Sequence, residues 1–330
     1  MNDGTLNPAT RAAHATNKPK TIGLIAAPFT PLNRDGTVHL EAVDEYAQWL
    51  HQNQVAGAFI CGTTGEGVSL TLEERMQLAE RWVAAAPDAL RVIVHVGHTA
   101  LPDARALAAH AQEIGAESIA CMAPFFFKPA GMETMVAWCE QVAAAAPHVP
   151  FYYYHLPSMT GVPLSVHQFL RNAAGRIPTL AGIKFTFEDL DDFERCLQFD
   201  GGRFDVLFGR DELLLAALKL GARGAVGSTY NYAAPLFHAL FAAHEGGDET
   251  AAAALQEIAV RMIDAFVRCG AHPLAAFKWF MSQVALDCGP VRLPLLTPSP
   301  EQIALLESGL EASGIYEWIK RKPALRSASS

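Results

Sequence analysis

The sequence predicts an α/β fold: a (β/α)8 TIM barrel followed by a C-terminal helical extension. Short apolar segments alternate with longer amphipathic segments eight times along the chain, with a spacing of roughly 25–35 residues. Such alternation favours a parallel sheet covered by helices. Eight units favour a closed barrel over a doubly wound open sheet, and no GxGxxG pattern follows the first apolar segment, which disfavours the open sheet further.

Each predicted strand is a short apolar run. The eight runs are TIGLIAAPF (21–29), GAFICG (57–62), RVIVHVG (91–97), ESIACMAP (117–124), PFYYYHL (150–156), LAGIKF (180–185), FDVLFG (204–209) and GAVGST (224–229). The amphipathic runs between and after them predict helices at about 38–53, 71–86, 100–114, 131–146, 165–174, 188–198, 211–220 and 231–245. The pattern is then helical throughout, at 248–269, 273–286 and 299–313.

These elements predict the domain organisation. Residues 21–245 are expected to form the barrel, and residues 246–318 the helical extension that packs on it. Residues 1–20 are polar and unpatterned, so we expect a flexible leader there, and residues 319–330 are expected to be a flexible tail.

Composition and charge exclude several classes of protein. The 330 residues are 51% hydrophobic and 18% charged, which suits a large globular protein, and no apolar run reaches the roughly 18 residues of a membrane helix. The N-terminus lacks the apolar region of a secretory signal. A net charge of −9 without a basic stripe argues against a nucleic-acid partner. Six cysteines without a CxxC pair predict reduced thiols in the cytoplasm, and we expect neither a metal nor a cofactor.

The polar residues that carry chemistry are expected at one end of the barrel. In TIM barrels the active site lies at the C-terminal ends of the strands and in the loops that follow them. The candidate residues there are GTTGEG (62–67) after the second strand, Tyr154 and His155 at the end of the fifth, Lys184 and Thr186 at the end of the sixth, Gly209, Asp211 and Glu212 after the seventh, and Gly227 and Ser228 at the end of the eighth.

Lys184 is the most informative of these residues, because it lies in an apolar strand with no obvious ionic partner. Burial disfavours the charged ammonium, and a neutral lysine amine can attack a ketone to form a Schiff base. Tyr154 on the neighbouring strand could carry the proton that this chemistry requires. The alternatives are a lysine whose stem is buried and whose head is solvated, and a tyrosine that only packs.

The loop GTTGEG predicts a site for an anion. Because the protein is acidic, such a site must be built locally, from backbone N–H groups and hydroxyls. Thr63 and Thr64 supply two hydroxyls, whereas an ordinary turn with a bracing Glu66 is the alternative. Asp211 and Glu212 begin a helix, where acidic residues also act simply as caps. His155 could orient a substrate, or it could be a satisfied histidine at the rim.

The motifs GTTGEG, YYYHLPSMTGV, GIKFT, FGRDE and GAVGSTYNY, in this order and spacing, resemble the N-acetylneuraminate lyase and dihydrodipicolinate synthase superfamily over about residues 21–315. The later GPVRLPL (289–295) is similar as well. The resemblance implies a barrel with C-terminal helices, usually a homotetramer, that acts on 2-keto acids through a lysine Schiff base.

The resemblance also implies roles for individual residues. Lys184 resembles the Schiff-base lysine and Tyr154 the proton-shuttling tyrosine. The pair Thr63 and Thr64 resembles the clamp that holds the pyruvate carboxylate. The residues that resemble contacts to the polyol part of a sialic acid are Thr186, Gly209, Asp211, Glu212 and Ser228.

Two departures from the superfamily bear on the substrate. Synthases typically carry an arginine in the loop after the catalytic tyrosine, and Met159 stands at that place. They also have a tyrosine, lent across a subunit contact, near the segment that here contains only Phe125, Phe126 and Phe127. YYYH, FGRDE and GSTYNY are more similar to the sialic acid lyases, especially their animal-like branch.

The resemblance therefore implies reversible cleavage of N-acetylneuraminate to N-acetylmannosamine and pyruvate. Three alternatives stay open: another aldolase or dehydratase of 2-keto-3-deoxy sugar acids, a dihydrodipicolinate synthase-like enzyme, and an inactive protein that binds keto acids. Since the relay tyrosine is missing, Ser228 or ordered water is a candidate for proton delivery.

Overall fold

The computed structural model describes residues 20–320 of the chain. The predicted leader and tail lie outside these residues, except for Lys20, Ile319 and Lys320. Ile319 is buried, and its N–H group donates to the carbonyl oxygen of Ile315. The packed part of the chain therefore continues one residue beyond the predicted end of the helical extension.

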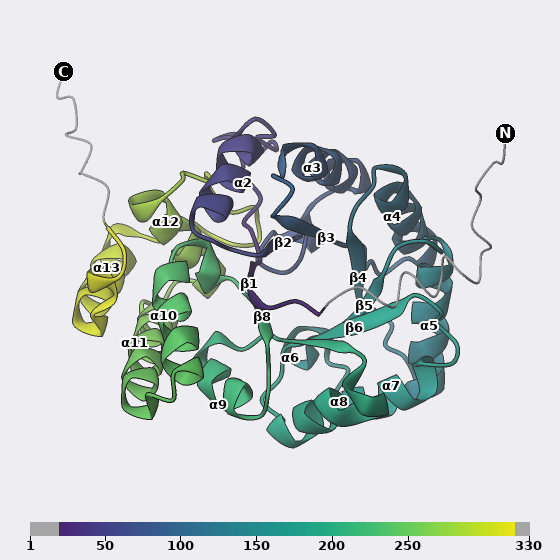
Figure 1. The fold of residues 1–330 in the computed structure, drawn as a ribbon. Helices are drawn as coiled ribbons and strands as arrows, with labels where there is room; N and C mark the ends of the chain where they lie inside the picture. The colour runs from purple at the N-terminus through teal and green to yellow at the C-terminus, as the bar shows by residue number, and fades with distance from the viewer. Residues whose placement is uncertain (1–19, 321–330) are drawn as a thin grey trace, which may run out of the picture.

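Eight parallel strands form a closed barrel in chain order, with β8 paired to β1 (Figure 1). They are β1 Gly23–Ala26, β2 Gly57–Ile60, β3 Arg91–His95, β4 Ser118–Met122, β5 Phe151–His155, β6 Leu180–Phe185, β7 Asp205–Phe208 and β8 Gly224–Gly227. The predicted TIM barrel is confirmed. Most strands are shorter than their apolar runs; β2, for example, ends at Ile60 because Cys61 adopts a left-handed φ of 56°.

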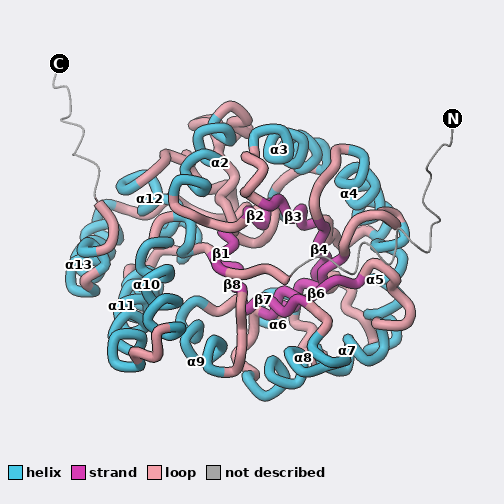
Figure 2. Tube along the Cα trace, in the orientation of Figure 1, coloured by secondary structure: helices cyan, strands magenta, loops and turns pink. Residues whose placement is uncertain are grey.

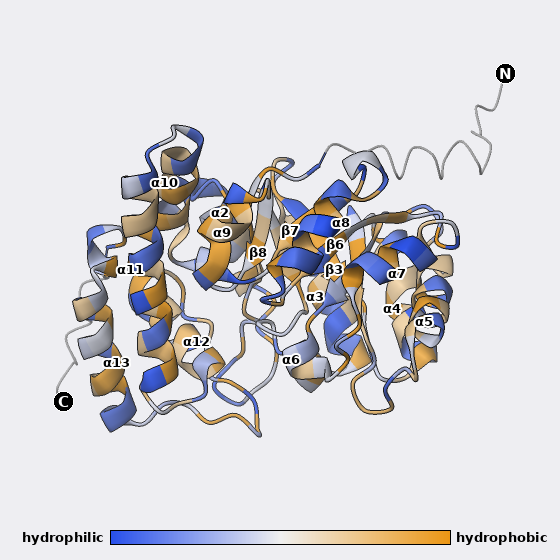
Figure 3. Cartoon of the chain, turned by 90° about the horizontal axis from the view of Figure 1, so that it is seen from below, coloured by the Kyte–Doolittle hydropathy of each residue, from blue (hydrophilic) through white to orange (hydrophobic). Residues whose placement is uncertain are grey.

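Most of the helices form a ring outside the strands (Figure 2), whereas the one-turn helix α6 Pro157–Thr160 follows β5 at one end of the barrel (Figure 3). The helices of the barrel are α2 Ala42–Gln52, α3 Leu72–Ala85, α4 Leu101–Glu113, α5 Met132–Ala144, α6 Pro157–Thr160, α7 Val166–Ala173, α8 Leu190–Gly202, α9 Leu214–Lys219 and α10 Ala234–Glu245, with short 3-10 helices η1 Gly67–Ser69, η2 Asp211–Leu213 and η3 Thr229–Asn231. The sequence did not predict α6. The predicted helix at 211–220 begins as the 3-10 helix η2 and continues as α9.

Local capping explains where some helices begin. At α3 the Thr71 hydroxyl accepts a hydrogen bond from the Glu74 N–H, and the Glu74 carboxylate accepts one from the Thr71 N–H. This reciprocal arrangement satisfies backbone donors that the first turn of a helix leaves unpaired.

The C-terminal helices are α11 Glu249–Arg268, α12 Pro273–Val284 and α13 Pro300–Ser313, followed by the 3-10 helix η4 Ile315–Glu317. Helix α11 packs beside α10, and α13 packs on the side of α11 that faces away from the barrel (Figure 3). The helices within residues 20–320 all lack the combination of length and apolar character that crossing a membrane requires.

Alternation along the strands creates two apolar layers. The larger layer fills the space between the strands and the helices, and a smaller one fills the barrel interior. Tyr152 and Tyr154 point into the barrel, whereas Tyr153 belongs to the outer layer. A Cβ atom at Gly182 would lie 2.6 Å from the Tyr152 ring, so only glycine leaves room for that ring below Lys184.

Candidate active site

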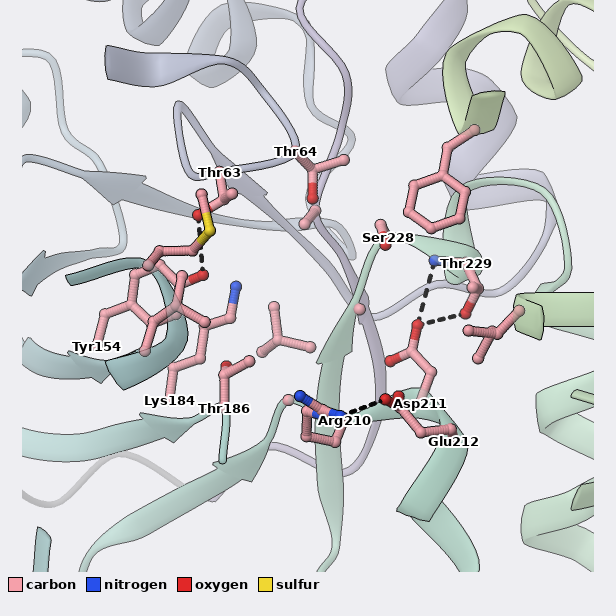
Figure 4. Close-up of a pocket in the computed structure, with 18 residues that line it drawn as sticks. Thr63, Thr64, Tyr154, Lys184, Thr186, Arg210, Asp211, Glu212, Ser228 and Thr229 are labelled. Carbon is pink, nitrogen blue, oxygen red and sulfur yellow. Dashed lines mark hydrogen bonds and ion pairs between the residues drawn. The ribbon is translucent and has the colours of Figure 1, made fainter. Parts of the chain in front are cut away.

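A cavity of about 240 Å³ opens at the C-terminal ends of the strands (Figure 4). The nine residues to which the family resemblance gave a role all line it: Thr63, Thr64, Tyr154, Lys184, Thr186, Gly209, Asp211, Glu212 and Ser228. The sequence analysis missed two further polar residues of the lining, Arg210 and Thr229. Both lie inside motifs that it quoted, so the missing information was the direction of their side chains.

The Lys184 side chain is buried in the barrel mouth, with only 5% of its surface exposed. Its Nζ lies 3.9 Å from the ring centroid of Phe59 and 4.2 Å from that of Tyr154. Burial lowers the pKa of Lys184 from 10.5 to about 7, although the Asp211 carboxylate acts in the opposite direction. The alternative of a solvated lysine head is therefore wrong, and a large fraction of the amine is neutral near neutral pH.

Tyr154 lies directly opposite Lys184 in the register of β5 and β6. Its hydroxyl shares a hydrogen bond of 3.2 Å with the Thr63 hydroxyl, and its ring packs edge-on against Phe59 and His95. Burial raises the pKa of Tyr154 to about 12, and the hydrogen bond with Thr63 partly opposes that shift. The phenol is therefore protonated at neutral pH and is held in a fixed orientation beside the amine.

The loop that carries Thr63 and Thr64 is braced from the C-terminal part of the chain. The buried Glu66 carboxylate accepts hydrogen bonds from Lys278 Nζ and from the backbone N–H of Arg292, each of 2.9 Å. Lys278 also donates to the carbonyl oxygen of Pro290 at 2.7 Å. Glu66 thus takes the bracing role that the sequence analysis weighed, through a buried ion pair with α12.

The opposite side of the cavity is polar. The buried Asp211 carboxylate accepts hydrogen bonds from the N–H and the hydroxyl of Thr229, while its Oδ1 has no hydrogen-bond partner among the described residues. Burial raises the pKa of Asp211 to about 6. A Cβ atom at Gly209 would lie 2.1 Å from the Thr186 hydroxyl oxygen, so glycine keeps that hydroxyl in place. This side of the cavity is suited to a ligand with several hydroxyl groups.

His155 does not belong to the site. It faces the helices, where its ring contacts those of Phe185 and Phe187, and it is absent from the cavity lining. Burial lowers its pKa to about 4. A role in orienting substrate and a position at the rim of the cavity are therefore both wrong.

A second cavity of about 290 Å³ adjoins the first and shares Thr63 and Met159 with it. Phe125 lines this second cavity, while Phe126 and Phe127 are 73% and 86% exposed. Within residues 20–320 no group of histidine, cysteine or acidic side chains is arranged to hold a metal ion. All six cysteines fall in the same range, and each is buried and free.

Comparison with known proteins defines the class. The dihydrodipicolinate synthetase family model matches residues 20–313, and the chain belongs to this family, as the sequence motifs predicted. Among its relatives, N-acetylneuraminate lyase of Mus musculus is 42% identical over 299 residues, which cover 89% of this chain and 93% of the relative. That of Xenopus tropicalis is 44% identical over 276 residues, which cover 83% and 90%.

Comparison with solved structures supports the same family. The Proteus mirabilis N-acetylneuraminate lyase superposes with a TM-score of 0.86 at 39% identity, covering 90% of this chain and all of that one. A dihydrodipicolinate synthase from Bacillus anthracis superposes with a TM-score of 0.80 at 26% identity, covering 88% and 98%. The chain is thus more similar to this lyase than to this synthase, in sequence as well as in structure.

Proposed function

We propose that the protein is a Schiff-base aldolase, a carbon–carbon lyase that reversibly cleaves N-acetylneuraminate to N-acetylmannosamine and pyruvate. The observation that carries the proposal is the pairing of Lys184 with Tyr154 in one cavity. The amine has a pKa of about 7, and the protonated phenol lies across from it on the adjacent strand. The similarity to N-acetylneuraminate lyases supports the choice of substrate.

Each residue of the site has its own role in the proposed reaction. The hydroxyls of Thr63 and Thr64, with the backbone of their loop, hold the substrate carboxylate. The Lys184 amine attacks the C2 ketone of the open-chain sugar acid, and loss of water gives an iminium ion. The iminium accepts the electron pair of the C3–C4 bond as that bond breaks.

Proton transfer completes the cycle. In our proposal Tyr154 acts as a relay: as the aldehyde of N-acetylmannosamine forms, its oxygen takes the C4 hydroxyl proton while its own phenolic proton passes to the substrate carboxylate, from which a proton is available for C3. The enamine that remains on Lys184 is protonated at C3 to give the pyruvate imine. Water then hydrolyses the imine, which releases pyruvate and regenerates the amine. The hydroxyl and carboxylate groups of Thr186, Asp211, Glu212 and Ser228 bind the polyol, and Gly209 gives it space.

We predict that the protein releases equal amounts of pyruvate and N-acetylmannosamine from N-acetylneuraminate, and that it does not condense pyruvate with aspartate semialdehyde. Met159, which lines the cavity, cannot pair with the second carboxylate of a synthase substrate. A site built to bond hydroxyls discriminates strongly, because a wrong ligand leaves its polar groups unpaired. Incubation with a panel of keto sugar acids, followed by assays for both products, measures this.

The same panel separates the alternatives. Pyruvate from a different sugar acid, with no cleavage of N-acetylneuraminate, would identify another aldolase. A dehydrated keto acid without an aldehyde product would identify a dehydratase. Efficient synthase activity would contradict the assignment, and binding of pyruvate without turnover on any substrate would indicate an inactive keto-acid-binding protein.

We also propose that the protein acts in the cytoplasm as a homotetramer. Exposed apolar side chains belong to the lining of the second cavity or lie next to lining residues in the sequence, and exposed apolar patches typically mark protein contacts. The most exposed of them are Val68, Phe126, Phe127, Met159, Leu293 and Leu296. Light scattering coupled to gel filtration should give about four times the 35.6 kDa chain mass, and a monomer would contradict the proposal.

A further inference from the structure

Arg210 reaches the substrate cavity from the loop that follows β7. Its Nη2 lies 2.7 Å from Glu212 Oε1, and its Nη1 lies 3.5 Å from Glu188 Oε2 (Figure 4 shows the first pair). Glu188 belongs to the loop after β6, whereas Glu212 belongs to η2. The guanidinium therefore links two loops at the mouth of the barrel. Its Nε is buried and has no hydrogen-bond partner among the described residues.

The Arg210–Glu212 ion pair matters because it changes the balance of charge in the cavity. Asp211 and Glu212 bring two carboxylates to the polar side, and in the described lining the cationic side chains are Lys184 and Arg210. Since Lys184 is partly neutral near its pKa of about 7, Arg210 is the more permanent positive charge. A protein with a net charge of −9 has no general attraction for an anionic sugar acid, so local cations matter.

We propose that Arg210 is a positioning residue that determines how tightly the polyol end of the substrate binds. By holding Oε1 of Glu212, the guanidinium fixes the plane of the carboxylate and leaves Oε2 to accept a hydrogen bond from a substrate hydroxyl. It also offsets the repulsion between the acidic pair and the anionic substrate. This inference rests on the proposed function, and it adds a residue that acts through Glu212 and not on the reacting atoms.

The test is a double-mutant cycle on Arg210 and Glu212, measured in two assays. One assay follows steady-state cleavage of N-acetylneuraminate, and the other follows borohydride trapping of the pyruvate imine. Arg210→Ala should raise KM for the sugar acid about tenfold, as expected for a lost charge-assisted hydrogen bond, with little change in kcat. Trapping at saturating pyruvate should stay normal, because pyruvate is too short to contact this pair and saturation removes any effect of the Arg210 charge on pyruvate binding.

The coupling between the two residues is the decisive quantity. Glu212→Ala alone should raise KM as well, and adding Arg210→Ala to it should change KM by less than about twofold. Arg210→Lys keeps the charge but loses the planar guanidinium group, so this variant should bind the sugar acid more tightly than Arg210→Ala and less tightly than the wild type. Arg203→Ala is the matched control, because Arg203 also pairs with a nearby carboxylate, that of Asp200, but lies outside the cavity.

Three results would overturn the inference. The first is an unchanged KM in both Arg210 variants. The second is that the effects of the two single substitutions on KM simply add in the double mutant. The third is a loss of pyruvate trapping as large as the loss of cleavage, which would indicate general damage to the barrel mouth. A wild-type protein that cleaves N-acetylneuraminate while the Arg210 variants behave normally refutes this inference alone. A wild-type protein that does not cleave it refutes the proposed function, and this inference with it.

Discussion

Replacing Lys184 with methionine should abolish cleavage of N-acetylneuraminate and remove the pyruvyl adduct that borohydride fixes on the wild-type protein. We expect activity to fall by about 10⁴-fold or more, because the variant loses both the nucleophile and the electron-accepting iminium. Methionine keeps the length and apolar character of the stem, so the buried position between Phe59 and Tyr154 should still be filled. Mass spectrometry of the reduced protein locates the adduct.

The control is Lys219→Met, because Lys219 lies outside the cavity and pairs with Glu249. This variant should keep both activity and the adduct. An adduct found in the wild-type protein on Lys128, Lys219 or Lys278, or no adduct at all, would contradict the mechanism.

The pH dependence of adduct formation is a second test of Lys184. Only the neutral amine attacks a ketone, and burial has lowered the pKa of Lys184 from 10.5 to about 7. The neutral fraction, and with it the initial rate of imine formation, should therefore rise as the pH increases from about 6 to about 8. A rate that rises only near pH 10 would mean that the amine titrates like a solvated lysine.

The barrel and its site could be predicted because two simple rules act together. Strand periodicity of two puts Gly182, Lys184 and Thr186 on one side of β6, and parallel strands bring their C-terminal ends to one edge. The resemblance to a known superfamily then identified which of the polar residues at that edge belong together. All nine of them line the cavity.

The same strand periodicity excludes His155 from the site. Since Tyr154 points into the barrel, the next residue must point toward the helices, and the structure places His155 there. Strand periodicity alone was therefore sufficient to exclude it from the site.

The pairing of Glu66 with Lys278 could not have been predicted in this way. The two residues are 212 positions apart, and their contact depends on how α12 docks against the barrel. The contacts of Arg210 with Glu188 and Glu212 could not be predicted either, because they depend on the direction of one side chain. Periodicity places a residue on an element, but it does not determine which distant partner a long, flexible side chain meets.

Tyr154→Phe should slow turnover by roughly 10²–10⁴-fold, the usual contribution of general acid–base catalysis. The substitution keeps the ring that packs against Phe59 and His95 and removes only the hydroxyl bonded to Thr63. With its pKa raised to about 12, the phenol does not ionise at neutral pH, so its contribution must come from moving a proton during bond cleavage. Adduct formation with pyruvate should therefore survive better than turnover.

Single-turnover cleavage and borohydride trapping, run side by side, separate these two steps. Tyr153→Phe is the matched control: Tyr153 is the adjacent buried tyrosine of β5, but it faces the helices and stacks on Phe169, so its loss should leave cleavage unchanged. If Tyr154→Phe turned over at a near-normal rate, the proton role would pass to another group at the cavity, such as Ser228 or an ordered water. If trapping and cleavage fell together, Tyr154 would act at the imine-forming step instead, because loss of proton transfer at C3–C4 cleavage leaves the earlier covalent step intact.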